Sequence, residues 1–334
     1  MVKLDGQRLK FRGFRRGQSV TIRDMDEILE TLDAEGRFEG MPFMPEMAAF
    51  CGKTFRVHRR AERTCVEGTG TRRLSGTVLL DGLRCDGSAH AGCERGCLFF
   101  WKEVWLKPAD LSAGDCPDSR VRENETPGSP AAQADPTELE AVSQLPTTRD
   151  GRFFCQSTEL AGATTDLPPG KLWPYWTDLR TGELRPRLFA HFLWMSLVNG
   201  LWRKMHGRAF HELTGPQKKT LTDELNLEPG EWVEIKSAAE IAATLDPQGR
   251  NRGLAFEREM ALHCGRRYRV AKPIRTIIVE ETGKMVQLAN TVILEGLICQ
   301  GVCSANCPRA NHLYWREIWL RRVMPGPEER QSRS

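Results

Sequence analysis

The chain contains one sequence pattern twice, and this internal duplication constrains its fold more than any other feature of the 334 residues. Residues 17–57, GQSVTIRDMDEILETLDAEGRFEGMPFMPEMAAFCGKTFRV, align without a gap with residues 230–270, GEWVEIKSAAEIAATLDPQGRNRGLAFEREMALHCGRRYRV. After a shift of one residue, TVLLDGLRCDG at 77–87 aligns with TVILEGLICQG at 291–301. An internal repeat of this length predicts two similar units, each with its own core.

Each copy contains the same local signals in the same order. Alternating apolar residues, as at Val20 and Ile22, predict a short strand, and Ile28 and Leu32 lie on one face of a helix expected next. Further strand-like stretches rich in β-branched and aromatic residues are FRV at 55–57, TVLL at 77–80 and FWKEVWL at 100–106. These signals predict an α+β fold of two duplicated small SH3-like β-barrels with helical insertions.

Composition divides the rest of the chain. A stretch rich in Pro, Ser, Ala, Asp and Glu follows the first copy and is typical of a flexible linker, and a Trp-rich apolar stretch then predicts a helical bridge. The expected organisation is a basic N-terminal arm at 1–16, a first Cys-rich barrel repeat at 17–108, a flexible linker at 109–150, a helical bridge at 151–229, a second Cys-rich barrel repeat at 230–324 and a disordered tail at 325–334.

Cysteine usage indicates metal binding or reactive thiols. The N-terminus has no apolar segment of the kind that secretory signals contain, so we expect a cytoplasmic protein. Eleven cysteines, an odd number, then favour metal ligation over a disulfide framework. The net charge of +4 is too small to predict nucleic-acid binding by itself.

Eight cysteines are interpreted as occupying matched places in the two copies, which gives four thiolates to each copy. The first set is Cys51, Cys85, Cys93 and Cys97, and the second is Cys264, Cys299, Cys303 and Cys307. Four thiolates are the ligand number of one [4Fe–4S] cluster or one Zn²⁺. We expect two iron–sulfur clusters, with two Zn²⁺ as the alternative, because no Cys-x-x-Cys zinc knuckle occurs and the Cys307–Pro308 step resembles the end of ferredoxin motifs.

The two copies also differ, and the differences indicate where a reactive centre would lie. The first copy inserts His90 between its second and third cysteines and has Cys65 where we align Thr276 of the second copy. Since an open or exchangeable ligand position is typical of catalytic metal sites, we expect any reactive centre in the first copy. The candidates are Cys65, His90, His58 and, beyond the linker, Cys155. For each histidine, a surface or loop position is the simpler explanation.

Other interpretations of the same residues stay open. The cysteines can be buried small apolar side chains, or their metal can only staple a barrel that is too small to be stable. Tryptophans in FWKEVWL and in YWREIWL at 314–320 can stack on nucleic-acid bases, but filling a barrel core is the simpler explanation. Glu103 and Glu317 on these stretches would need partners if buried, and we expect them to be Arg56 and Arg269.

The most apolar stretch is FAHFLWMSLVNGLW at 189–202. It is shorter than the roughly 20 residues that span a bilayer, so we expect no transmembrane segment. Basic residues flank it, which leaves attachment to a membrane surface open, and a buried helix explains the same pattern.

Several phrases of the chain resemble those of one group of proteins. GMPFMPEM, RCDGSAHAGC, FWKEVWL, CPRANHLYWREIWL and CQSTEL are similar to sequences of an uncharacterised group of cysteine-rich bacterial proteins that is loosely associated with biosynthetic gene neighbourhoods. The resemblance covers most of the chain outside 110–148 and implies no activity or catalytic residue. It implies only that the cysteine motifs are a pattern.

The predicted function is therefore that of a metal-binding protein, with iron–sulfur preferred, in redox or sulfur chemistry of a bacterial biosynthetic pathway. The alternative is a zinc-stapled adaptor that binds protein or nucleic acid through its barrels. A redox or pathway protein is the expected partner, and nucleic acid is not favoured. Neither the motifs nor the resemblance assigns a reaction, so the sequence leaves open whether the protein is an enzyme.

Overall fold

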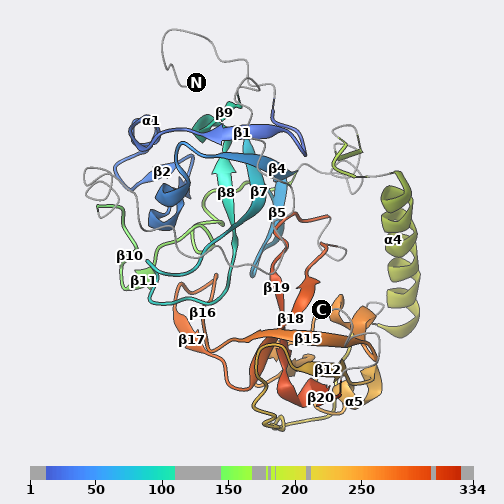
Figure 1. Ribbon diagram of the computed structural model, residues 1–334. Coiled ribbons are helices and arrows are strands. Elements are labelled where there is room, and N and C mark those ends of the chain that lie inside the picture. The colour runs from blue at the N-terminus through green and yellow to red at the C-terminus, as the bar shows by residue number, and fades with distance from the viewer. Residues whose placement is uncertain are drawn as a thin grey trace.

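Two similar curled sheets of antiparallel strands dominate the computed structural model (Figure 1). The model describes residues 13–109, 144–167, 178–179, 182–184, 186–207, 212–301 and 306–324. The first sheet has the order β8-β7-β4-β1-β9. Its strands are β1 (Ser19–Ile22), β4 (Thr54–Arg60), β7 (Thr77–Arg84), β8 (Leu98–Lys102) and β9 (Leu106–Pro108).

The second sheet repeats this order as β19-β18-β15-β12-β20. Its strands are β12 (Trp232–Ile235), β15 (Arg267–Pro273), β18 (Thr291–Ile298), β19 (His312–Arg316) and β20 (Leu320–Arg322). Each strand of one sheet thus has a counterpart in the other, which confirms the predicted duplication. The architecture is barrel-like and mostly β, with few helices, where the sequence predicted an α+β fold.

Short elements occupy corresponding places between these strands. The helices are α1 (Met25–Leu29) and α5 (Ala238–Ala242), with the 3₁₀ turns η1 (Pro45–Phe50), η2 (Glu103–Trp105), η3 (Met260–His263) and η4 (Glu317–Trp319). The two-stranded ribbons are β2 (Arg37–Phe38) with β3 (Met41–Pro42), β5 (Arg63–Val66) with β6 (Gly70–Arg73), β13 (Arg250–Asn251) with β14 (Leu254–Ala255) and β16 (Thr276–Ile278) with β17 (Met285–Gln287).

Breaks in strand register curl each sheet into a half-barrel. The pairing of β7 with β8 shifts between Leu79 and Arg84, and a backbone φ of +73° at Gly82 lies inside this break. Gly296 has a φ of +70° at the equivalent place in β18. Only glycine adopts such angles at little cost. The dipeptides Asp81-Gly82 and Glu295-Gly296 therefore allow the same bend in both copies.

Buried aromatic side chains fill each half-barrel. Trp315 and Trp319 are fully buried, and the ring of Phe256 meets them edge-on at centroid distances of 6.2 and 5.2 Å. Trp101 and Trp105 meet Phe43 in the same way. The core interpretation of these tryptophans is therefore confirmed, and their rings are not exposed for base stacking.

The closing stretch of each copy differs from the continuous strand that the sequence predicts. In the first copy, η2 interrupts it, and the buried Glu103 pairs with Arg60 at 2.5 Å instead of with Arg56. In the second copy, Glu317 accepts backbone N–H bonds from residues 225–227 at 2.6–3.1 Å instead of pairing with Arg269. The predicted partners, Arg56 and Arg269, were therefore wrong. Each carboxylate belongs to a 3₁₀ turn, which points it in a different direction from a strand, toward the donors at that end of the barrel.

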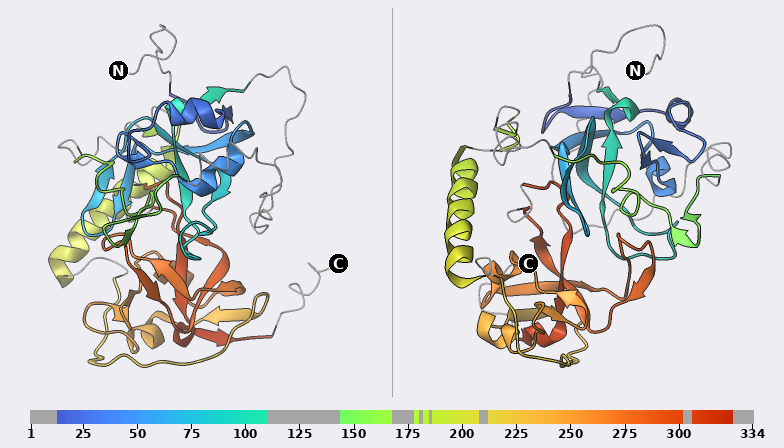
Figure 2. Two further views of the ribbon diagram at one scale, coloured as in Figure 1. Left: turned by 90° about the vertical axis from the view of Figure 1, so that its left-hand side faces the viewer. Right: turned by 180° about the vertical axis from the view of Figure 1, so that it is seen from behind.

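The predicted helical bridge, 151–229, contains helix only in part of its length. Helix α4 (Pro186–His206) lies along one side of the molecule (Figure 2), and its side chains Trp194, Leu197, Leu201 and Met205 are exposed, unlike those of the buried helix that the sequence favours. Within the described residues, no helix combines the length and apolarity needed to cross a bilayer.

The segments on either side of α4 pack against the repeats. Leu145, Cys155 and Leu160 belong to the core of the first repeat, and a hairpin of β10 (Thr148–Arg149) and β11 (Arg152–Phe153) lies between them. Leu225 and Leu227 pack on the core of the second repeat. Most of the predicted linker, 110–143, and nearly all of the predicted arm and tail, 1–12 and 325–334, lie outside the described residues.

The aromatic core gives a direct test of the packing. We expect Phe256→Ala to lower the free energy of unfolding by about 3–5 kcal/mol, because it removes a buried ring from between two buried indoles. Urea denaturation followed by tryptophan fluorescence measures the change. Leu262→Ala, at a side chain that is 45% exposed, is the control, with a change within about 0.5 kcal/mol. A loss of equal size in both variants would contradict the described core.

A candidate thiol site at the junction of the repeats

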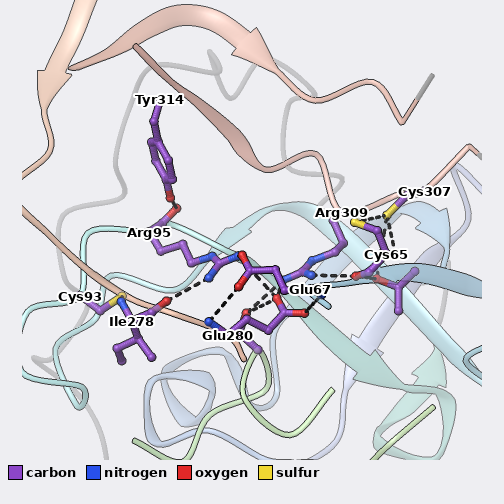
Figure 3. A network of polar contacts seen from close by, with 11 residues as sticks. Cys65, Glu67, Cys93, Arg95, Ile278, Glu280, Cys307, Arg309 and Tyr314 are labelled. Atoms are coloured by element: carbon purple, nitrogen blue, oxygen red, sulfur yellow. Dashed lines mark hydrogen bonds and ion pairs between the residues drawn. The ribbon is translucent and has the colours of Figure 1, made fainter. Parts of the chain in front are cut away.

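The two repeats meet through a pair of reciprocal contacts to cysteine sulfur. The backbone N–H of Ile278 donates to the Sγ atom of Cys93 at 3.4 Å, and that of Cys65 donates to the Sγ atom of Cys307 at 3.2 Å (Figure 3). In each case the donor belongs to one repeat and the sulfur to the other. The junction is therefore isologous, as in a symmetric dimer, although it lies within one chain.

Two arginines and two glutamates continue this reciprocity. Arg95 and Arg309 each donate to a backbone carbonyl of the opposite repeat, both at 2.9 Å. Each also pairs with a glutamate of its own repeat, Arg95 with Glu67 at 2.8 Å and Arg309 with Glu280 at 2.7 Å. The two glutamates accept each other's backbone N–H at 3.0 and 3.1 Å. Figure 3 shows these contacts as one continuous network.

The cysteine-bearing loops close in the same way in both repeats. The N–H of Cys85 donates to the carbonyl of Cys97, and the N–H of Cys299 donates to the carbonyl of Asn311, both at 2.8 Å. The two loops thus have equal lengths, and Cys97 is the counterpart of Asn311. The predicted match of Cys97 with Cys307 was wrong, because the sequence alignment placed a gap inside a loop whose own hydrogen bonds fix its register.

The same register corrects two further equivalences. Cys93 corresponds to Cys307, as their reciprocal contacts show, and not to Cys303, which lies outside the described residues. Cys65 corresponds to Ile278 and not to Thr276. The two copies therefore share fewer cysteine positions than the sequence suggested, and each copy has thiols of its own.

Four cysteines line one cavity at this junction. They are Cys85, Cys93 and Cys97 of the first repeat and Cys155 of the segment that follows the linker. Ile278 closes the cavity from the second repeat. The other lining residues are Met44, His90, Arg95, Gly96, Leu98, Phe99, Gln156 and Ser157.

Cys155 reaches the cavity because its neighbour is tied to the sheet. The side-chain amide of Gln156 donates to the carbonyl of Phe100 and accepts its N–H, both at 2.8 Å, as another strand would. The N–H of Cys155 donates to the Thr158 hydroxyl at 3.0 Å, which closes a turn. Burial raises the pKa of the Cys155 thiol to about 11.

The predicted first quartet is thus brought together in part. Cys51 follows η1 in the turn that leads into β4 and is not among the residues that line the cavity. Its match Cys264 occupies the same turn after η3, half-buried. Of the second quartet, Cys299 packs beside Glu259 and Cys307 lies at the junction. Across the part of the chain that the structure describes, no three Cys, His, Asp or Glu side chains converge as they would around one metal ion.

A buried carboxylate orients the first cysteine loop. Glu46 accepts hydrogen bonds from the Cys85 thiol at 3.6 Å and from the N–H of Ala89 at 3.2 Å, and it lies 2.8 Å from Nδ1 of His90. Burial raises the pKa of the Cys85 thiol, and the charge of Glu46 raises it further. Glu259 accepts from the Cys299 thiol at 3.1 Å in the second repeat, so this anchor is duplicated.

His90 is fully buried, and both of its ring nitrogens are engaged. Nε2 donates to the carbonyl of Phe154 at 3.0 Å, while Nδ1 faces Glu46. Burial lowers the pKa of the His90 imidazole, but the hydrogen bond and charge of Glu46 outweigh this effect and raise it. His90 therefore orients the loop here, and neither nitrogen presents a lone pair to the cavity.

The remaining catalytic candidates lie apart from the cavity. His58 sits on the surface in β4, with Nδ1 2.8 Å from Asp81. The thiol of Cys65 lies 3.4 Å from the Sγ atom of Cys307 across the junction. The hydrogen bond between them lowers the pKa of Cys307 and raises that of Cys65.

The sequence interpretation missed the charged residues of the junction. Arg95 and Glu67 had a detectable signal, because Arg309 and Glu280 stand at the equivalent positions of the other copy. Ser157 carried no such signal; its hydroxyl donates to Glu280 and accepts from Arg309, both at 3.0 Å, on one side of the junction only.

No family model, curated protein or solved structure matches this chain. The site combines thiols, a cavity, and buried cationic and N–H donors that stabilise negative charge on sulfur.

The buried ion pair at the junction has a measurable effect on stability. We expect Arg309→Met to lower the free energy of unfolding by about 3 kcal/mol or more, because it leaves the carboxylate of Glu280 buried without its closest cation. Arg322→Met, which removes a half-exposed arginine that pairs with Glu231, should cost less than about 1 kcal/mol. Urea denaturation measures both, and equal small losses would contradict the buried network.

Glu280 also predicts a pH dependence. Burial raises the pKa of its carboxyl, but Arg309 and Arg95 outweigh burial and hold the pKa below its ordinary value of 4.5. A folded-state pKa below the unfolded value contributes stability that is complete above pH 4.5 and is lost as the pH falls through the folded pKa. We expect Glu280→Gln to be less stable than the wild type at pH 7, with a difference that shrinks below pH 4.5. A difference that stays constant down to pH 3 would contradict this origin.

Proposed function

We propose that this protein binds an iron–sulfur cluster in the cavity lined by Cys85, Cys93, Cys97 and Cys155. The cluster would serve redox or sulfur chemistry in the cytoplasm, in a bacterial biosynthetic pathway. The single observation that carries this proposal is that four cysteines, from two distant segments, line one cavity, although among the described residues their side chains are not gathered around one point. Four thiolates are the full ligand set of a [4Fe–4S] cluster.

The surroundings of the cavity suit an anionic cluster. Arg95 is among its lining residues, and the N–H of Ile278 already donates to the sulfur of Cys93. Hydrogen bonds to the sulfurs and nearby positive charge are the features by which proteins tune cluster potential. Apolar side chains such as Phe99 and Met44 would exclude water from the same site.

The ligand set proposed here replaces Cys51 of the predicted first quartet with Cys155. A second cluster, in the second repeat, remains a prediction from sequence, since it depends in part on Cys303. We propose a redox or pathway protein as the partner.

We further propose that each repeat is an SH3-like barrel. Two features support this class: the strand order β8-β7-β4-β1-β9, and the 3₁₀ turn η2 between β8 and β9, which are the last two strands of the repeat along the chain. The second repeat has the same strand order, with the 3₁₀ turn η4 between β19 and β20.

The alternative of a zinc-stapled adaptor receives less support. A metal staple is needed where a domain lacks a core, whereas each repeat packs its own continuous apolar cluster. The burial of the tryptophans also removes the aromatic surface on which nucleic-acid bases would stack in that alternative.

The test is the iron and acid-labile sulfide content of anaerobically purified protein. The wild type should be brown, and Cys93→Ala and Cys155→Ala should each lose about four irons and four sulfides per chain. Cys65→Ile, which changes a thiol outside the cavity and outside both predicted quartets, is the control and should keep them.

Two outcomes would contradict the proposal. Stoichiometric zinc without sulfide would replace the cluster with a single-ion site. Loss of iron in Cys51→Ala but not in Cys155→Ala would show that the ligands are the quartet predicted from the sequence, which contains Cys51. The cluster would then not lie in the cavity.

A further inference from the structure

A second group of thiols lies outside the cavity. Cys65 and Cys307 come from different repeats, and their Sγ atoms are 3.4 Å apart (Figure 3). Neither residue lines the cavity. Proximity of two cysteines from distant parts of the chain is the geometric requirement for a disulfide.

Several contacts hold the two thiols together. The N–H of Cys65 donates to the Sγ atom of Cys307 at 3.2 Å, and Arg309 donates to the carbonyl of Cys65 at 2.9 Å. The backbone on both sides is also fixed, because Asp178 accepts from Asn306 at 2.6 Å and pairs with Arg63. The pair is therefore positioned by buried polar contacts on both sides and not by a chance meeting of mobile loops.

We propose that Cys65 and Cys307 form a redox-active dithiol that a peroxide converts into a disulfide between the two repeats. The sulfurs need to approach by only about 1.4 Å to reach the bonded distance of about 2.05 Å. The site goes beyond the proposed cluster, since it uses none of the four cysteines that line the cavity and needs no metal. It takes Cys307 from the second quartet predicted from the sequence, so the disulfide and a second cluster held by Cys307 exclude each other.

The reaction balances with hydrogen peroxide as the oxidant. One sulfur attacks the peroxide, the O–O bond breaks, and a sulfenic acid forms with release of water. The second sulfur then displaces the sulfenic oxygen, which leaves as a second water, and the S–S bond forms. In total two S–H bonds and one O–O bond break, the two sulfurs lose two electrons, and the peroxide becomes two waters.

The other half of the junction supplies a matched comparison. Cys93 occupies the position equivalent to Cys307, but it faces Ile278, which has no thiol. The chain itself therefore shows that isoleucine is accommodated opposite a cysteine in this geometry. Cys65→Ile makes the two halves of the junction alike, and it should remove the dithiol without unfolding the protein.

The experiment treats the full-length protein with hydrogen peroxide, alkylates the remaining thiols under denaturing conditions and identifies disulfide-linked peptides by tandem mass spectrometry. In the wild type, the link between Cys65 and Cys307 should exceed any other cysteine pair by about tenfold. Cys264→Ser, outside the junction, should behave like the wild type. Cys65→Ile should lose the link while keeping the far-ultraviolet circular dichroism and Tm of the reduced wild type.

A thermal measurement gives a second readout. The disulfide would close a very long loop of chain, so the oxidised wild type should melt several degrees above its reduced form, and Cys65→Ile should show no such increase.

Three outcomes would overturn the proposal. In the first, the Cys65 thiol remains fully alkylatable while other cysteines oxidise. In the second, Cys65 forms disulfides with several cysteines in equal amounts. In the third, the disulfide with Cys307 forms but does not raise the Tm of the protein. The iron and sulfide content of Cys65→Ile distinguishes this proposal from the proposed cluster. A protein that holds iron and sulfide but forms no disulfide contradicts only the dithiol, and one that forms the disulfide but holds no iron contradicts only the cluster.

Discussion

The junction depends on the burial of Arg309 together with Glu280. A guanidinium and a carboxylate that are both withdrawn from water are stable only while each has the other, so any movement that separates them costs several kcal/mol. Arg309 also donates to the carbonyl of Cys65, and Glu280 to the opposite repeat through its backbone N–H. The ion pair lies within the second repeat, and these two hydrogen bonds connect it to the first repeat, so it orients the groups that hold the thiols on both sides of the junction.

Around this symmetric framework the thiols are distributed unequally. One half of the junction places Cys93 against Ile278 and adds the cavity with Cys97, whereas the other half places Cys307 against Cys65. The backbone hydrogen bonds are the same in both halves, so divergence changed the chemistry of the side chains and left the scaffold intact. A duplicated scaffold in this way carries two different arrangements of thiols, one proposed here to hold a cluster and one proposed to form a disulfide.

Each repeat supplies the rigidity that such sites require. Edge-to-face contacts among Phe256, Trp315 and Trp319 fix the ends of the second sheet, as their counterparts do in the first. The long connecting segment then adds Cys155 to a site that is otherwise built by the first repeat. The two hydrogen bonds between the Gln156 side chain and the backbone of Phe100 hold this segment against the first sheet, as the backbone hydrogen bonds of a paired strand would.

The sequence by itself determined the duplication, the half-barrel made by each copy, the core position of the tryptophans and three of the four thiols around the cavity. These follow from local periodicity, glycine positions and self-similarity, which are properties of neighbouring residues. Only the tertiary structure decided that Cys155 joins the cavity, that Cys65 faces Cys307 and that Glu103 pairs with Arg60. Such contacts join residues far apart in the chain, and their partners are selected by burial and by hydrogen bonds that no local pattern records.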